Sequence, residues 1–190
     1  MAFSDLEKEN IREKLMTNCE KSWSKYGYKK TNIEDLCYKS GISKGAFYLF
    51  YSSKEELFCD VMIHVQKRLV DLTKEKLGIK PTKQNLSEAF QMLFREYNKL
   101  PFIMETQTPD FITFMNKLST DKIKELEEHG QFDIQKLIQN SGLIFQIEEK
   151  KALTLLVLIF RPLPYDETFP FDPFEATDFM IDTLINKIFK

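Results

Sequence analysis

The stretch of sequence that decides the fold runs from residue 25 to residue 57, KYGYKKTNIEDLCYKSGISKGAFYLFYSSKEEL. Its centre, residues 31–50, contains two short segments with helical spacing, separated by the turn Gly41-Ile42-Ser43. Thr31 and Glu34 have the spacing of a capping box that would open the first helix, and Gly41 is the residue type that ends helices. Two short helices joined in this way predict a helix-turn-helix, whose second helix places its N-terminal residues along base edges in the major groove.

A helix that reads DNA needs small side chains where its backbone approaches the groove, and basic and hydroxyl groups around it to hold phosphates. Gly45 and Ala46 meet the first requirement. The free N–H groups of helices predicted to start at Thr31 and Ser53 would add further phosphate donors. The side chains that meet the second requirement are Lys29, Lys30, Thr31, Lys44, Tyr48 and Lys54.

Spacings of three and four residues between apolar side chains recur along the rest of the chain, whereas strict alternation of apolar and polar residues does not. This pattern predicts an all-α protein. The linker at residues 161–172 contains three prolines and is expected to be irregular. The other predicted helices span residues 4–27, 53–77, 85–100 (capped by Asn85 with Glu88), 108–118, 120–141, 148–160 and 173–189.

The net charge of −2 conceals an asymmetry along the chain. Residues 20–54 carry 7 Lys/Arg and 3 Asp/Glu, a charge of +4, whereas residues 55–190 carry 17 and 22, a charge of −5. The basic segment coincides with the predicted helix-turn-helix, which favours a polyanionic partner for that part of the chain.

Several classes of protein are disfavoured by the remaining composition. Cys19, Cys37 and Cys59 are odd in number and lack metal-ligand spacing, which is typical of reduced, cytoplasmic thiols. The two histidines lie apart, the first residues lack the order of a signal peptide, and the longest apolar run, 152–160, is too short to cross a bilayer. We therefore expect a cytoplasmic protein with no metal, no cofactor and no membrane association. Nothing resembles a nucleophile elbow, a P-loop or a dinucleotide fingerprint, so we do not expect an enzyme.

Residues 25–57 resemble the DNA-binding domain of the TetR-type (tetracycline-repressor-like) transcriptional regulators. The shared features occur in the same order: the aromatic-Gly-aromatic run 26–28, Thr31, Gly-Ile-Ser-Lys-Gly at 41–45, Tyr48, and Ser-Lys-Glu-Glu-Leu at 53–57. The resemblance covers roughly residues 5–62. It implies a three-helix DNA-binding domain, which we place at residues 1–52, joined by a long helix to an effector-binding and dimerisation domain at 53–190.

The resemblance also assigns roles to individual residues. It implies that Thr31, Tyr48 and Lys54 contact the DNA backbone, and that Lys44 meets a phosphate or a base. Ala46 and Leu49 replace positions that are often polar in the family, which leaves apolar contact with thymine methyl groups as one way of reading bases. The expected DNA-binding residues are Lys30, Thr31, Ser43, Lys44, Gly45, Ala46, Tyr48, Leu49 and Lys54.

Aromatic and methionine side chains recur at helical spacing in the second part of the chain. They fit either an ordinary core or the apolar effector pocket that the resemblance implies. A pocket of this kind would suit a small apolar or aromatic effector. The candidate pocket residues are Phe90, Phe94, Tyr97, Met104, Phe111, Phe114 and Met115.

The sequence thus predicts a homodimeric regulator of transcription. The last two predicted helices, 148–160 and 173–189, correspond to the pair that forms the dimer interface in TetR-type proteins. We expect a ligand-responsive repressor of a palindromic duplex operator. The alternative is a DNA-binding dimer whose C-terminal domain binds a protein or only dimerises, without an effector.

Overall fold

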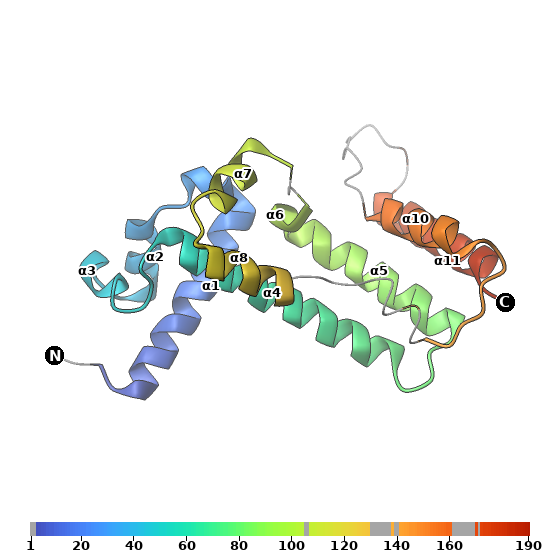
Figure 1. Ribbon diagram of the computed structural model, residues 1–190, viewed down its shortest axis with the longest axis horizontal. Coiled ribbons are helices and arrows are strands. Elements are labelled where there is room, and N and C mark those ends of the chain that lie inside the picture. The colour runs from blue at the N-terminus through green and yellow to red at the C-terminus, as the bar shows by residue number, and fades with distance from the viewer. Residues whose placement is uncertain (1–2, 105–106, 130–137, 139–140, 161–169, 171) are drawn as a thin grey trace. The chain divides into compact units, whose positions relative to one another are not determined.

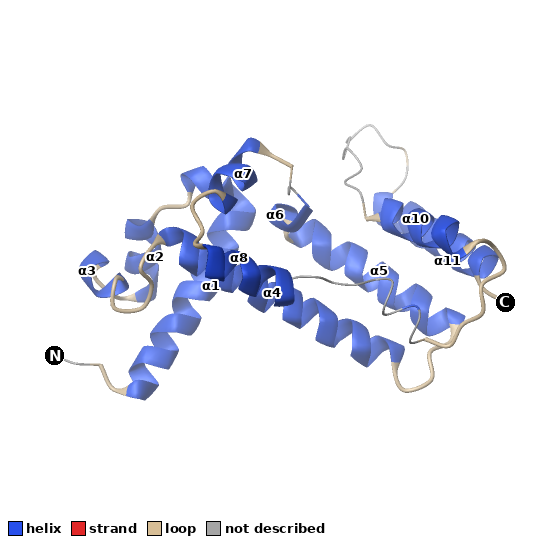
Figure 2. Ribbon diagram, in the orientation of Figure 1, coloured by secondary structure: helices blue, strands red, loops and turns tan. Residues whose placement is uncertain are grey.

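The computed structural model describes residues 3–104, 107–129, 138, 141–160, 170 and 172–190. Within these residues every regular element of secondary structure is a helix (Figures 1 and 2), which confirms the predicted all-α fold. The one departure is an isolated antiparallel bridge between Phe145 and Phe189, near the C-terminus. None of the helices in these ranges is long and apolar enough to cross a membrane.

The chain divides into two compact units. The first comprises Met1–Lys67 with Pro101–Gln131, and the second comprises Arg68–Leu100 with Phe132–Lys190. Helix α4 (Lys54–Leu77) contributes residues to both. The predicted domain boundary at residues 52–53 stays a prediction.

The first unit opens with helix α1 (Asp5–Lys30), whose start the sequence predicts correctly. Ser4 and Glu7 form a capping box at this start. The sequence predicts an end near Gly27, and this is where the regular helix breaks: Gly27 has φ of +77° and ψ of +171°, outside the helical range. A last helical turn continues beyond this kink to Lys30.

Apart from α1 and α4, the described helices of this unit are short. The helix-turn-helix consists of α2 (Ile33–Ser40) and α3 (Lys44–Phe47). The 101–131 segment contributes α6 (Pro101–Met104), α7 (Pro109–Met115) and α8 (Thr120–His129). Pro109 occupies the first turn of α7, and Thr108 caps this helix. The predicted continuation of α8 to residue 141 falls largely outside the described residues.

An aromatic cluster forms the centre of the first unit. The indole of Trp23 stacks on Phe102, with ring centroids 4.2 Å apart, and contacts Phe58 at 4.4 Å and Phe114 at 5.5 Å. All four side chains are buried. The cluster therefore packs α6 and α7 against α1 and α4.

The second unit contains the end of α4 together with α5 (Lys83–Lys99), α10 (Glu149–Ile159) and α11 (Pro173–Ile188). Most of the linker 161–172 lies outside the described residues. The sequence predicts Asn85 as the cap of α5, but the cap is Thr82, whose hydroxyl accepts from the Asn85 N–H at 3.1 Å. Asn85 instead supplies the third helical position, from which its side chain accepts from the Thr82 N–H at 3.3 Å.

Polar side chains join α5 to α11. Gln91 Nε2 donates to Asp182 Oδ1 at 2.9 Å, and the buried Ser87 hydroxyl donates to the same carboxylate. One turn further along α5, Arg95 binds Asp178 with two nitrogens, its Nη1 at 2.9 Å from Oδ1. The Arg95 guanidinium also lies 5.9 Å from the centre of the Phe174 ring.

We expect Arg95→Ala to lower the free energy of unfolding by about 1–2 kcal/mol, because a charge-assisted, bidentate pair is lost at a partly solvent-screened site. Arg95→Lys should recover only part of the loss, since an ammonium cannot bind a carboxylate through two fixed nitrogens. Urea denaturation of both variants and of Asp178→Ala measures the effect. Strictly additive losses in the Arg95→Ala, Asp178→Ala double variant would contradict a direct coupling.

Candidate nucleic-acid interface

The helix-turn-helix is held by a small set of hydrogen bonds within residues 31–50. Gly41 ends α2 in the left-handed conformation (φ +74°), and its N–H donates to Tyr38 O at 3.2 Å. The Ile42 N–H donates to Cys37 O at 3.0 Å. Ser43 caps α3, its hydroxyl accepting from the Ala46 N–H at 3.2 Å. These bonds fix the angle at which α3 leaves the turn.

Two corrections apply to the helix ends. Asn32, and not Thr31, caps α2, because its side chain accepts from the Asp35 N–H at 2.8 Å. The predicted capping box of Thr31 with Glu34 is therefore absent, which leaves Glu34 free to contact another residue. Helix α3 is also shorter than predicted: it ends at Phe47, and the residues up to Phe50 form a turn in which the Phe50 N–H donates to Phe47 O at 2.9 Å.

The inward and outward faces of this motif differ sharply. Leu36, Cys37 and Phe47 are buried, so they anchor the motif to the first unit. Tyr48 and Leu49 have exposed fractions of 52% and 72%. Tyr48 and Leu49 follow directly after α3, so the turn that ends this helix presents a tyrosine and a leucine to solvent.

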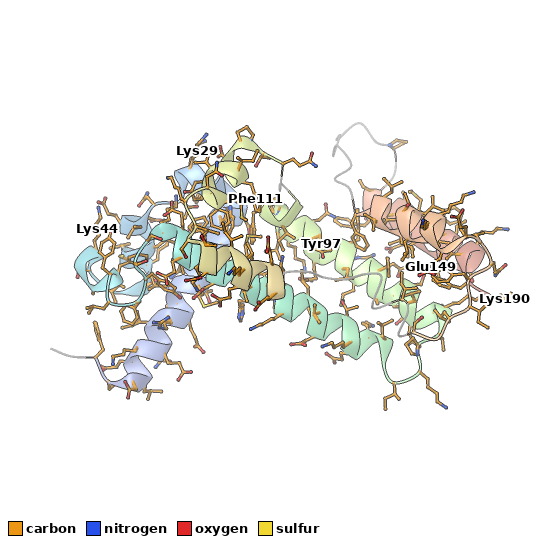
Figure 3. All side chains as sticks on the ribbon, viewed as in Figure 1. Lys29, Lys44, Tyr97, Phe111, Glu149 and Lys190 are labelled. Atoms are coloured by element: carbon orange, nitrogen blue, oxygen red, sulfur yellow. The ribbon has the colours of Figure 1, made fainter. Side chains whose placement is uncertain are left out.

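The remaining expected DNA contacts divide into two groups. Lys30, Ser43, Lys44 and Gly45 are exposed and Ala46 is half-buried; Figure 3 labels Lys44 on this motif. At Gly45 an added Cβ would meet only Ser43 Oγ, at 3.9 Å, so close backbone approach to this position is open. Lys30, Ser43, Lys44 and Gly45 are therefore accessible to a partner, as Tyr48 and Leu49 are.

Thr31 and Lys54 are engaged within the protein. Thr31 is buried, and its hydroxyl donates to Gly27 O at 2.9 Å. The Lys54 ammonium donates to Tyr28 O and lies 4.3 Å from the centre of the Tyr28 ring. Burial lowers the pKa of Lys54 below its ordinary value. Both residues link the kinked end of α1 to its neighbours, and any DNA contact by them stays a prediction.

Sequence reasoning missed two exposed residues on α2. Tyr38 has an exposed fraction of 85%, and Glu34 lies one turn before it on the same helix. The Glu34 carboxylate is 2.8 Å from the Lys44 ammonium. The sequence spacing could have indicated that these residues are exposed, because positions 34 and 38 lie one helical turn apart and opposite the buried pair Leu36 and Cys37. The apparent capping box assigned Glu34 a different role.

The candidate effector residues are divided between the two compact units. Phe90, Phe94 and Tyr97 belong to the second unit, where Phe90 and Tyr97 contact Phe160 at ring distances of 5.4 and 5.5 Å. Phe94 contacts Phe174 at 5.9 Å. The other four, Met104, Phe111, Phe114 and Met115, belong to the first unit, with the Phe111 and Phe114 rings 5.7 Å apart. Their role in binding an effector stays a prediction.

A partly buried polar network lies beside Lys54 in the first unit. The Tyr28 hydroxyl donates to the Glu55 carboxylate, and Lys117 Nζ lies 3.6 Å from that carboxylate and 3.4 Å from the Tyr28 hydroxyl. Burial favours the neutral form of Glu55, but the hydrogen bond from Tyr28 and the charge of Lys117 outweigh it and lower the pKa of that carboxyl.

The lowered pKa of Glu55 predicts a pH dependence of stability. A carboxyl whose pKa is lower in the folded than in the unfolded state stabilises the fold above its unfolded value, about 4.3, and loses this contribution as the pH falls. The stability difference between the natural protein and Glu55→Gln should therefore be largest near neutral pH and shrink below about pH 4. Urea denaturation at several pH values measures it, and a constant difference would contradict the assignment.

Tyr48 offers a direct test of the outer face. Tyr48→Ala should weaken binding to duplex DNA by about tenfold or more, because it removes a hydroxyl and an aromatic ring from the contact surface. The fold should be retained, since the side chain is exposed and only its edge contact with Phe47 is lost. Fluorescence anisotropy with labelled DNA measures the effect, and Tyr26→Ala, an exposed tyrosine on α1, is the control.

Comparison with known proteins places this interface in a family. Residues 19–61 match the family model described as bacterial regulatory proteins, tetR family. The chain is 28% identical over 142 residues to the uncharacterized HTH-type transcriptional regulator YerO of Bacillus subtilis (strain 168). The match covers 70% of this chain and 46% of YerO, so the chain spans less than half the length of that relative.

Solved structures share the whole fold. The TetR-family transcriptional regulator PfmR from Thermus thermophilus superposes with a TM-score of 0.61 at 19% identity, covering 90% of this chain and 97% of PfmR. A transcriptional regulator from Saccharomonospora viridis, solved in complex with choline, superposes with a TM-score of 0.65 at 12% identity, covering 96% and 99%. The relative and both solved neighbours are described as transcriptional regulators, which is the class of protein that the sequence predicts. The helix-turn-helix thus lies within a segment that matches the tetR family of bacterial regulatory proteins, and the chain shares the fold of solved TetR-family regulators.

Proposed function

We propose that the protein is a repressor that binds a palindromic duplex operator as a homodimer and is released from it by a small apolar or aromatic effector. The observation that carries the DNA-binding part is the exposed surface of α3 and of the turn that follows it, where Lys44, Tyr48 and Leu49 are exposed around a Gly45-Ala46 backbone. Lys44 and Tyr48 supply phosphate or base contacts, and Leu49 supplies apolar contact with thymine methyl groups.

The proposed homodimer is supported by α10 and α11. Their exposed side forms an apolar groove of about 400 Å³, whose lining is aliphatic and aromatic apart from one threonine. Phe179 on its wall has an exposed fraction of 73%. A second copy of this surface would bury these side chains, and it would place two recognition helices on one palindrome.

The effector response has separate support. The Saccharomonospora viridis neighbour shows that a protein of this fold holds a small organic ligand. The second unit of this chain contains several aromatic side chains around Phe160, which would suit an apolar or aromatic ligand if the packing opens to admit one. The alternative is a dimer that binds DNA without an effector, which the close packing of Phe90, Tyr97 and Phe160 favours.

Selection of bound duplexes from a random library tests the proposal. A homodimer with one recognition helix per half-site should enrich a palindrome whose half-sites lie about one helical turn, ~10 bp, apart. Failure to enrich any sequence would overturn operator binding. Affinity for the enriched duplex is then measured with a panel of small apolar and aromatic compounds, where a fall of about 5-fold or more supports release by an effector. A panel without effect supports the alternative.

A further inference from the structure

The pair between Glu34 and Lys44 lies on the surface that faces DNA in the proposed function. Lys44 is the first residue of α3, and its Nζ is 2.8 Å from Glu34 Oε1 on α2. Both side chains are more than half exposed. Leu36 and Cys37 occupy the buried side of α2, so Glu34 is on the outward side with Tyr38.

The two charges stabilise each other. The hydrogen bond between them, followed by their mutual attraction, lowers the pKa of Glu34 and raises the pKa of Lys44. Both groups are therefore charged at neutral pH, and the pair is neutral as a unit. To bind the DNA backbone, Lys44 must leave the Glu34 carboxylate and bind a phosphate instead. The Glu34 carboxylate is then unpaired and lies near the negatively charged phosphates.

We infer that Glu34 is a specificity-determining residue: it positions Lys44 and, by pairing with it, weakens the contact of Lys44 with phosphates of DNA of any sequence. The inference rests on the proposed operator binding. Phosphate contacts are the same in every sequence, whereas contacts to base edges are not. A residue that weakens phosphate contact therefore lowers affinity for random DNA more than affinity for the operator. At the operator a base contact offsets the loss, either from Lys44 to a guanine acceptor or from a cytosine amino group to Glu34.

The test compares Glu34→Gln with the natural protein. Both are measured against a random-sequence duplex and against the duplex that the natural protein enriches, between about 50 and 200 mM salt. Removing the restraint should add one phosphate contact per protomer, so random DNA should bind about 3–10-fold tighter, with a salt dependence steeper by about one unit per protomer. The ratio of enriched to random affinity should fall accordingly.

A second background separates positioning from simple charge. If Glu34 acts through Lys44, then Glu34→Gln in the Lys44→Ala protein should change affinity for random DNA by less than about twofold. An equal gain in that background would overturn the inference, since Glu34 would then act through its own repulsion of DNA. An unchanged affinity for random DNA in Glu34→Gln alone would overturn it as well.

The controls keep this result distinct from the proposed function. Glu75→Gln removes the same charge from an exposed position on α4 in the second compact unit, and it should leave the ratio unchanged. Circular dichroism should show equal helix content in all variants, since the pair is exposed. If the natural protein enriches no duplex, operator binding itself has failed. If it enriches one and Glu34→Gln behaves like the natural protein, only the role of Glu34 has failed.

Discussion

Phe179→Glu should give a folded monomer that binds operator DNA about 100-fold or more weakly than the natural protein. Phe179 is 73% exposed on α11, and Met180 and Leu158 beside it are also exposed. The substitution therefore removes little packing within the protomer. In a dimer it would bury an unpaired carboxylate in an apolar groove, at a cost that the interface cannot recover.

DNA affinity falls in a monomer because its recognition helix is no longer joined to a second one that binds the other half-site. In a dimer the second recognition helix binds at an effective concentration set by the first, which raises overall affinity by about 10²–10⁴ over one half-site. Analytical ultracentrifugation measures the oligomeric state, and DNA titration the affinity. Phe179→Leu keeps an apolar side chain and should behave like the natural protein. A Phe179→Glu protein that remains dimeric would contradict the assignment of this groove to self-association.

The helix-turn-helix was predictable because its signals are local. The predicted helix end at Gly41 and the cap at Ser43 each depend on neighbours within a few residues, and the structure shows both. The choice between Thr31 and Asn32 as the cap of α2 depends on the residues before it. Thr31 caps the end of α1, where its hydroxyl donates to Gly27 O, and spacing within residues 31–34 cannot reveal this contact.

Contacts between distant segments lay beyond sequence reasoning for the same reason. The aromatic residues after position 90 form one series at helical spacing, yet Phe114 packs with Trp23 and Phe58 in one unit while Phe90 packs with Phe160 in the other. Periodicity shows that such a side chain faces inward, but it does not show which segment it meets. Lys54 is a similar case, since its position at the head of α4 suits a phosphate contact and its ammonium is held by Tyr28.

Trp23→Ala should lower the free energy of unfolding of the first unit by about 3–5 kcal/mol, because it removes the central side chain of the buried aromatic cluster. The side chain is buried and contacts three rings, from Phe58, Phe102 and Phe114. Its removal leaves a large cavity and breaks a stacked pair with Phe102 whose planes are 12° apart. Urea denaturation followed by circular dichroism measures the loss.

Two comparisons make this prediction specific to the cluster. Tyr26→Ala removes an aromatic ring from the same helix at an exposed position, and it should cost about 1 kcal/mol or less. Phe102→Ala keeps Trp23, the sole tryptophan of the sequence, as a reporter. In this variant the fluorescence of Trp23 should shift to longer wavelength, because water reaches the indole through the space left by the Phe102 ring. If Trp23→Ala lowered the free energy of unfolding no more than Tyr26→Ala does, the prediction would be wrong. The cavity left by Trp23 would then cost no stability, and the packing of α6 and α7 would not depend on this cluster.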